Sequence, residues 1–125
     1  MNGYITNIEE KTLQNRNFRK VLFTAPNSQL VIMSLKASED IGKEVHDVDQ
    51  FIRIEQGDGT VTLNGKTSDI HAEFAFVIPA GTEHNVTNGA KGEMKLYTIY
   101  SPAHHRDGTV HETKAAAEAD ESDHR

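Results

Sequence analysis

The stretch VIPAGTEHNV, residues 77–86, decides how this chain is expected to fold. It begins inside the apolar run FAFVI, which is typical of a β-strand. Pro79 and Gly81 are typical of a tight turn. A strand that returns after this turn would carry His84 back across the structure, opposite the strands that precede it.

Short strand candidates of the same kind lie on both sides of this turn. They are rich in β-branched and aromatic residues, and turn-forming residues separate them. The candidates cover residues 17–24, 28–35, 51–55, 60–65, 74–81 and 93–101. Alternate residues of a strand share a face, and one face of the last candidate holds Met94, Leu96, Thr98 and Tyr100. This succession of short strands predicts an all-β sandwich or barrel.

The length of 125 residues is that of a single domain. We place this domain at residues 1–112. The segment TKAAAEADESD, residues 113–123, favours a helix through its Ala and Glu content, but it offers no apolar face for docking. We therefore expect residues 113–125 to form a polar tail that is frayed or disordered.

The composition excludes several classes of protein. No run approaches the roughly 18 apolar residues of a membrane span, and the N-terminus lacks the apolar stretch of a signal peptide. The net charge of −6 comes without a cluster of Lys and Arg, which argues against nucleic acid as a partner. The chain has no cysteine, so any metal must be held by nitrogen and oxygen. We expect a cytoplasmic protein that binds neither membranes nor nucleic acids.

Four donor side chains follow a pattern that suits such a metal. Glu44 and His46 are two residues apart in a segment of extended character, so they share a face. Gln50 lies a further even step along the chain, at the start of the strand FIRIE. His84 would join them from the returning strand. One lining could thus present all four side chains.

These residues resemble the motifs of the cupin family, which read G-x5-H-x-H-x3-E-x6-G and G-x5-P-x-G-x2-H-x3-N. The second motif is matched by Pro79, Gly81, His84 and Asn88. The first is matched in frame with changed residues, because Glu44 and His46 take the two His positions. Gln50 takes the Glu position, seven residues before Gly57. The resemblance implies a double-stranded β-helix, that is, a jelly-roll barrel.

Two further features bear on this resemblance, namely the residues at the glycine positions of the motifs and a likeness to one subgroup of the family. Ser38 and Glu73 stand where the two motifs begin with glycine. The stretches LQNRNFRKVLFT, VDQFIRIEQGDG, VIPAGTEHNV and KLYTIYSPAHHRDGTVHETKA resemble small single-domain RmlC-like cupins that are often called mannose-6-phosphate isomerase-like. This likeness spans residues 12 to about 117.

We predict that one divalent metal ion per chain is bound by Glu44, His46, Gln50 and His84. Two imidazoles and a carboxylate suit Fe, Mn, Ni or Zn. The resemblance implies an isomerase-like enzyme that uses the metal as a Lewis acid on a small polyol or sugar. The donor set also suits a non-haem Fe or Mn oxygenase, and a non-catalytic small-molecule binder or sensor remains open. No catalytic side chain is assigned.

The remaining polar residues receive structural roles. We expect solvated loop positions for His71, His104, His105 and His111, and turn roles for Asp47 and Asp49. At most one of Tyr97 and Tyr100 should point inward, where core packing is its expected role. Arg53 alternates away from Gln50 and no other cation falls among the assigned inward positions, which argues against a sugar phosphate as ligand.

The strand FRKVLFT, residues 18–24, is a candidate for an exposed sheet edge. Exposed edges of small sandwiches are usually covered. Pairing of this strand across a two-fold axis would cover it, so we expect a homodimer.

Overall fold

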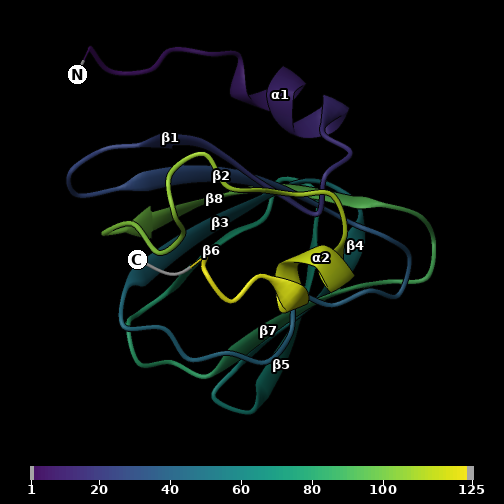
Figure 1. Cartoon of the computed structure of the whole chain (residues 1–125). Coiled ribbons are helices and arrows are strands. Elements are labelled where there is room, and N and C mark those ends of the chain that lie inside the picture. The colour runs from purple at the N-terminus through teal and green to yellow at the C-terminus, as the bar shows by residue number, and fades with distance from the viewer. Residues whose placement is uncertain (1, 124–125) are drawn as a thin grey trace.

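Two antiparallel β-sheets pack face to face in the computed structural model, which describes residues 2–123 (Figure 1). The larger sheet has the strand order β6-β3-β8-β2-β1-β9 and the smaller one the order β5-β4-β7. The strands are β1 (Arg19–Thr24), β2 (Gln29–Leu35), β3 (Asp49–Gln56), β4 (Asp58–Leu63), β5 (Lys66–His71), β6 (Ala75–Ile78), β7 (His84–Asn88), β8 (Met94–Ser101) and β9 (Val110–His111). The predicted all-β fold is confirmed, and every predicted strand has a counterpart.

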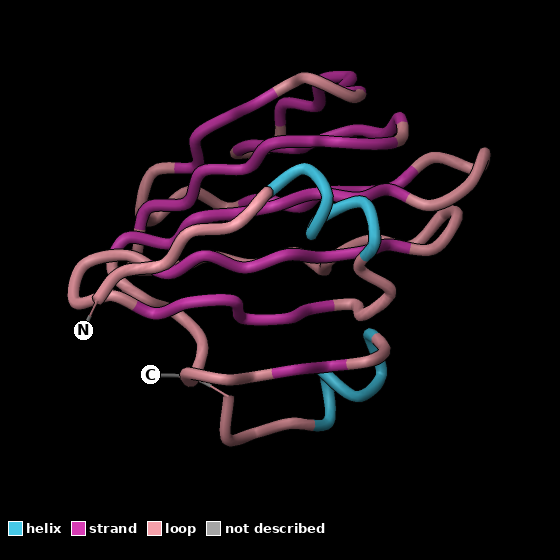
Figure 2. Tube along the Cα trace, turned by 90° about the horizontal axis from the view of Figure 1, so that it is seen from above, coloured by secondary structure: helices cyan, strands magenta, loops and turns pink. Residues whose placement is uncertain are grey.

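Two short helices accompany the sheets. Helix α1 (Ile8–Gln14) lies on the outer face of the larger sheet, against β8, β3 and β2 (Figure 1). Asn7 caps it by accepting a hydrogen bond from the Glu10 N–H. Helix α2 (Lys114–Ala119) follows β9 beyond the β1 edge of this sheet (Figure 2). Neither helix of the described residues is long and apolar enough to span a membrane.

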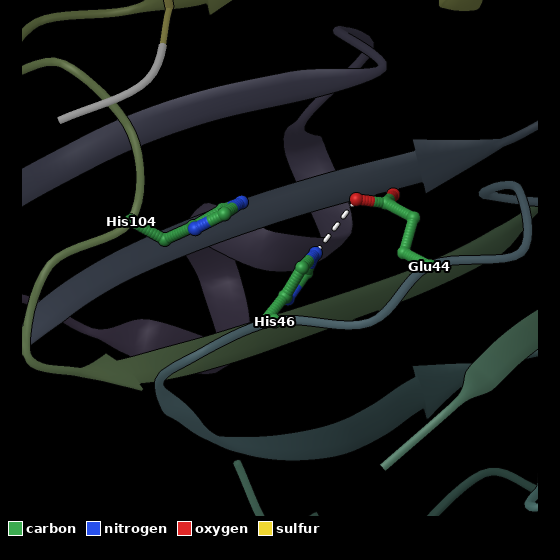
Figure 3. A group of neighbouring side chains, drawn as sticks. All are labelled: Glu44, His46 and His104. Carbon is green, nitrogen blue, oxygen red and sulfur yellow. Dashed lines mark hydrogen bonds and ion pairs between the residues drawn. The ribbon is translucent and has the colours of Figure 1, made fainter. Parts of the chain in front are cut away.

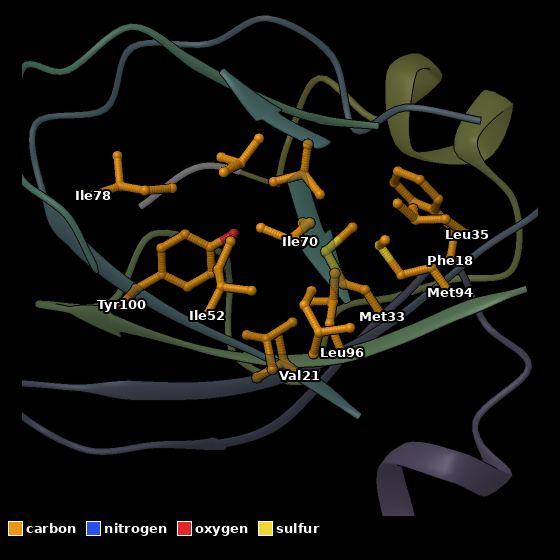
Figure 4. Close-up of a cluster of buried hydrophobic side chains, with 14 of the residues drawn as sticks. Phe18, Val21, Met33, Leu35, Ile52, Ile70, Ile78, Met94, Leu96 and Tyr100 are labelled. Atoms are coloured by element: carbon orange, nitrogen blue, oxygen red, sulfur yellow. The ribbon is translucent and has the colours of Figure 1, made fainter. Parts of the chain in front are cut away.

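The hydrophobic core fills the space between the two sheets (Figure 4). The inward face of β8 supplies Met94, Leu96 and Tyr100, which alternation placed together, while Tyr97 lies on the opposite face and is half-buried. The fully buried apolar side chains include Met33, Leu35, Ile52, Ile54 and Val86. The first strand residues of β3 and β7 that turn inward are polar, namely Gln50 and His84, and both are buried.

The chain passes between the sheets at a glycine. Gly57 connects β3 to β4 with φ +103°, and a Cβ atom there would lie 3.0 Å from the Glu93 carbonyl oxygen. This close approach and the left-handed conformation both favour glycine. Gly57 is also the last residue of the first motif, so the motif position has a conformational reason.

The two residues that stand in place of the motif glycines have positive φ angles. Ser38 has φ +64° and Glu73 has φ +78°. Both residues therefore adopt the left-handed conformation that glycine accepts without penalty. The chain keeps the geometry of the motif although the residue types differ.

Ser38→Gly and Glu73→Gly are expected to stabilise the protein. A non-glycine residue in this conformation costs about 1–2 kcal/mol, and the added freedom of the unfolded chain offsets part of the gain. Each change should raise the free energy of unfolding by about 0.5 kcal/mol in urea titrations. Ala37→Gly, next to Ser38, is the control and should have the opposite sign. A loss of stability in both glycine variants would contradict this account.

The C-terminal segment differs from the frayed tail that we expected. It forms α2, whose Ala117 packs against the core, and Asp123 is buried with 3% exposure. The Lys114 ammonium donates a hydrogen bond to the Asp40 carboxylate. Polar and ionic contacts thus dock a segment that lacks an apolar face. The domain boundary at residue 112 stays a prediction, and residues 124 and 125 lie outside the described part.

The strand that we expected at a sheet edge is paired on both sides at its start. β9 covers β1 at Arg19 and Lys20, so the edges of the larger sheet are β6 and β9. This removes the argument for dimerisation through this part of β1. The homodimer itself stays a prediction.

Candidate metal centre

Glu44 and His84 face each other across an isolated antiparallel bridge. The Glu44 N–H donates to the His84 carbonyl at 2.9 Å, and the His84 N–H donates to the Glu44 carbonyl at 2.9 Å. The bridge lies where the chain approaching β3 passes the first residue of β7. Directly opposed residues place their side chains on the same face. The carboxylate and the imidazole therefore share one space.

His46 lies one alternation step from Glu44 and turns to the same side. Its side chain is buried, and its Nε2 lies 2.6 Å from Oε2 of Glu44 (Figure 3). The ring of His46 meets that of His84 edge-on, with centroids 4.8 Å apart. Asp47 and Asp49 are exposed, as alternation predicted. Glu44 and His46 thus come together, and His84 is their neighbour through the backbone bridge and the ring contact.

Gln50 belongs to the inward face at the start of β3. It pairs with Tyr100 of β8 and Ile78 of β6 and is 4% exposed. Its Nε2 donates to Oγ1 of Thr98 at 3.0 Å. Its Oε1 is buried and accepts no hydrogen bond from any residue of the described chain. The amide is oriented by one hydrogen bond, and the oxygen that a metal would bind is available.

Two of the predicted donors lie close enough together to share one divalent ion. Bonds from nitrogen and oxygen to such an ion measure about 2.0–2.2 Å, which sets neighbouring donors about 3 Å apart. Nε2 of His46 and Oε2 of Glu44 are hydrogen-bonded at 2.6 Å, and an ion between them would replace this bond. Nδ1 of His84 lies 2.8 Å from the Thr82 carbonyl, which fixes the ring and leaves Nε2 for a metal. The assignment of the four residues as ligands stays a prediction.

His104 enters the same space from the segment after β8 (Figure 3). Ligand atoms of Glu44, His46 and His104 lie within 4.8 Å of one another, and the rings of His46 and His104 have centroids 4.0 Å apart. The expectation that His104 is solvated was wrong, since it is half-buried. No alternation or motif marks this segment, so the only signal in the sequence was the His-His pair itself.

The electrostatics favour an ionised carboxylate at this site. Burial acts to raise the pKa of Glu44, but the hydrogen bond with His46 and the charges of His46, Arg19 and His104 outweigh it. The pKa of Glu44 is therefore held below its ordinary value. A metal ligand must be deprotonated, and Glu44 meets this requirement at neutral pH.

A row of three buried, hydrogen-bonded side chains lies next to the candidate metal centre. Oδ2 of Asp123 lies 2.7 Å from Nδ1 of His105, whose Nε2 lies 3.3 Å from the Tyr100 hydroxyl. Burial raises the pKa of Tyr100 to about 12 and lowers the pKa of His105 below its ordinary value. The neutral His105 ring therefore donates to Asp123 and accepts from the Tyr100 O–H.

The expectation of solvated positions was also wrong for His105 and His111. Both are less than 5% exposed, and each bonds to an acidic residue of the C-terminal segment. His111 Nε2 lies 2.9 Å from Oδ2 of Asp120. The docking of the segment 113–123 buries these rings, so their burial could not be predicted without it. His71 is exposed, as expected.

The expectation that no cation faces inward was wrong as well. Arg19 lies on the inward face of β1, shared with Val21, and is 7% exposed. Alternation along FRKVLFT could have revealed it. Arg53 does turn outward, toward Glu55. Lys95 is buried too, but under α1, where it donates to Ser34 Oγ at 2.9 Å.

The sandwich of two antiparallel sheets with inward donors near β3 and β7 defines a cupin, and comparison with known proteins agrees. The model of the family described as Cupin domain matches residues 31–100. The chain therefore belongs to the cupin family, whose members often bind metals.

Individual proteins match this chain over more residues than the family model does. The uncharacterized protein YrkC of Bacillus subtilis is 48% identical over 126 residues, which cover 94% of this chain and 67% of YrkC. The crystal structure of BH2720 from Bacillus halodurans has a TM-score of 0.92 and 44% identity, with 94% of each chain covered. An RmlC-like cupin from Shewanella frigidimarina has a TM-score of 0.62 and 20% identity over 68% of this chain and 75% of its own, so it supports the fold alone.

Proposed function

We propose that this cupin binds one divalent ion through Glu44, His46, Gln50 and His84 and acts on a small polyol or sugar-like molecule. The proposal rests on the hydrogen-bonded side chains of Glu44 and His46 and on His84, which pairs with Glu44 and whose ring meets that of His46 edge-on. Oε1 of Gln50, which accepts no hydrogen bond within the described residues, also supports the proposal. Membership of the mannose-6-phosphate isomerase-like subgroup belongs to the same proposal.

A bound ion would supply Lewis-acid chemistry for a carbonyl or hydroxyl group of the substrate. The protein supplies the surroundings for this chemistry. Ionised Glu44 offsets part of the charge of the ion. An open pocket of about 430 Å³ borders Glu44 and His105, and its size suits a small molecule.

The experiment that tests the proposal combines elemental analysis with an activity screen. We expect the purified protein to retain about one transition-metal ion per chain. NMR should then follow aldose–ketose interconversion across a panel of neutral sugars and sugar acids, before and after chelation. Absence of any bound metal under all loading conditions would refute the proposal.

The same residues support a second candidate function. Two imidazoles and one carboxylate also form the donor set of non-haem Fe(II) oxygenases. Oxygen uptake by the Fe- or Mn-loaded protein in the presence of a substrate would favour this candidate over isomerisation. A protein that is active with zinc alone would exclude it. Ligand-induced shifts in melting temperature without turnover would indicate a binder or sensor.

Gln50→Glu should tighten the binding of divalent ions by about tenfold, because a carboxylate is a stronger donor to a hard cation than an amide. Gln50→Leu removes the donor and should weaken binding. Competition titrations with a metal-binding dye measure both variants against the wild type. Equal affinity of the wild type and Gln50→Leu would show that Gln50 is not a ligand.

A further inference from the structure

Arg19 is a buried cation whose guanidinium carbon lies 5.2 Å from the centroid of the Phe18 ring. Its side chain is 7% exposed, and its Nε is buried without a hydrogen bond. Its Nη1 lies 3.4 Å from Nδ1 of His111, a neutral group when it accepts this bond. No carboxylate of residues 2–123 forms an ion pair with it. The charge of Arg19 interacts with the carboxylates of Glu44 and Asp123 without direct contact. The buried Nε still lacks an acceptor, and an unsatisfied buried donor is costly.

The two aspartates of the neighbouring C-terminal segment are engaged elsewhere. Asp123 lies against His105 and accepts a further bond from the Thr109 hydroxyl at 3.0 Å. Asp120 bonds to His111 and accepts two bonds from Ser122. Neither carboxylate is directed at the guanidinium group. Arg19 thus retains its capacity for a ligand.

Arg19 also lines the pocket of about 430 Å³ that borders the candidate metal centre. Glu44 belongs both to the wall of this pocket and to the predicted donor set. The pocket therefore extends from the guanidinium group to Glu44, which is the member of the predicted donor set that lines it. A small molecule in it would meet Arg19 with one end and the metal side with the other.

The charged side chains that line this pocket limit which ligands can bind. Glu118 and Glu121 line the pocket together with Asp120 and Asp123. Lys114, the other cation in the lining, is engaged with Asp40. A phosphate dianion would meet one available cation and several carboxylates. A single carboxylate suits the planar guanidinium, which can bind it through two parallel hydrogen bonds.

We propose that Arg19 binds the carboxylate of a small hydroxy acid whose hydroxyl groups extend toward Glu44 and the metal donors. This inference rests on the proposed function for the metal end of the ligand, and it narrows the substrate class from polyols in general to hydroxy acids. The carboxylate would also give the buried Nε of Arg19 a hydrogen-bond acceptor.

Calorimetric titration of the metal-loaded protein tests the inference with two matched probes, D-gluconate and D-glucitol. They share a six-carbon polyol chain and differ in one terminal group, carboxylate or hydroxymethyl. We expect gluconate to bind about tenfold or more tightly than glucitol, because a charged hydrogen-bonded pair is gained. Equal affinities, or no binding of gluconate, would overturn the inference.

Substitutions of Arg19 then identify the group responsible. Arg19→Met should weaken gluconate binding by about 10- to 100-fold and leave glucitol binding unchanged. Arg19→Lys keeps the charge without the planar fork and should restore binding only in part. If Arg19→Met fails to fold, Arg19→Lys still reports the loss. Lys20→Met, on the opposite face of the same strand, is the matched control. Unchanged gluconate affinity in both Arg19 variants would contradict the proposal.

Metal content separates this inference from the proposed function. The Arg19 variants should still take up the ion, because Arg19 is not a donor, and Arg19→Lys also keeps the charge that acts on Glu44. Metal uptake with no effect of Arg19 would refute the present inference alone. A wild type that takes up no metal would refute the proposed function. The preference for gluconate over glucitol would then be measured on the metal-free protein, where its absence would refute the role of Arg19 as well.

Discussion

His84→Ala is expected to abolish stoichiometric metal binding. The ring of His84 is held by its contact with the Thr82 carbonyl and meets the ring of His46 edge-on. Loss of this donor removes one of the two predicted imidazole ligands. We expect the affinity to fall by more than about 100-fold, beyond the loss caused by removing an outer hydrogen-bonding partner of a ligand. Metal analysis after desalting measures the effect.

The control for this experiment is His71→Ala. His71 is an exposed imidazole on β5, and its ring lies against Phe74, outside the predicted donor set. This variant should bind metal as the wild type does. Circular dichroism of both variants establishes that the fold persists. Full metal retention in folded His84→Ala would contradict the predicted centre.

Gly59→Ala is expected to have the largest effect on stability. Gly59 lies in β4, the middle strand of the smaller sheet. A Cβ atom there would lie 2.1 Å from the Thr87 carbonyl oxygen and 2.8 Å from the Met94 methyl group. The methyl group can move, but the carbonyl belongs to the paired backbone of β7. We expect the free energy of unfolding to fall by about 3 kcal/mol, at the upper end of overpacking effects.

Gly65→Ala provides the comparison. Gly65 has φ +82°, but no atom lies within 4 Å of the Cβ position. Its substitution should cost about 1 kcal/mol, from backbone conformation alone. Urea denaturation of both variants therefore separates steric contact from conformational strain. A smaller effect at Gly59 than at Gly65 would contradict the packing described for β4 and β7.

Alternation in the sequence was sufficient to predict the parts of the fold whose two faces differ. β3 buries one set of alternate residues, so the orientation of Gln50 followed from the pattern. In β8 alternation placed Tyr97 and Tyr100 on opposite faces, but it left open which face points inward, and Lys95 is buried on the other face. β5 was missed because its residues are polar and all but Ile70 are exposed. α1 was missed because it is short and buries only Thr12.

The candidate site was predictable only where its residues lie on such strands or in a motif. The bridge that joins Glu44 to His84 agrees with the motif frame. His104 and the buried partners of His105 depend on how the C-terminal segment docks, which is a matter of tertiary contacts between distant residues. Arg19 was overlooked because its strand was expected at an exposed edge.

The backbone pairing of Glu44 with His84 bears on which ions the protein would select. Main-chain hydrogen bonds set the backbone spacing at these two predicted ligands, and such bonds do not adjust to ionic radius. Gln50 also stands on a paired strand, whereas His104 comes from the segment after β8. Discrimination among similar divalent cations should therefore change most when His104 is altered.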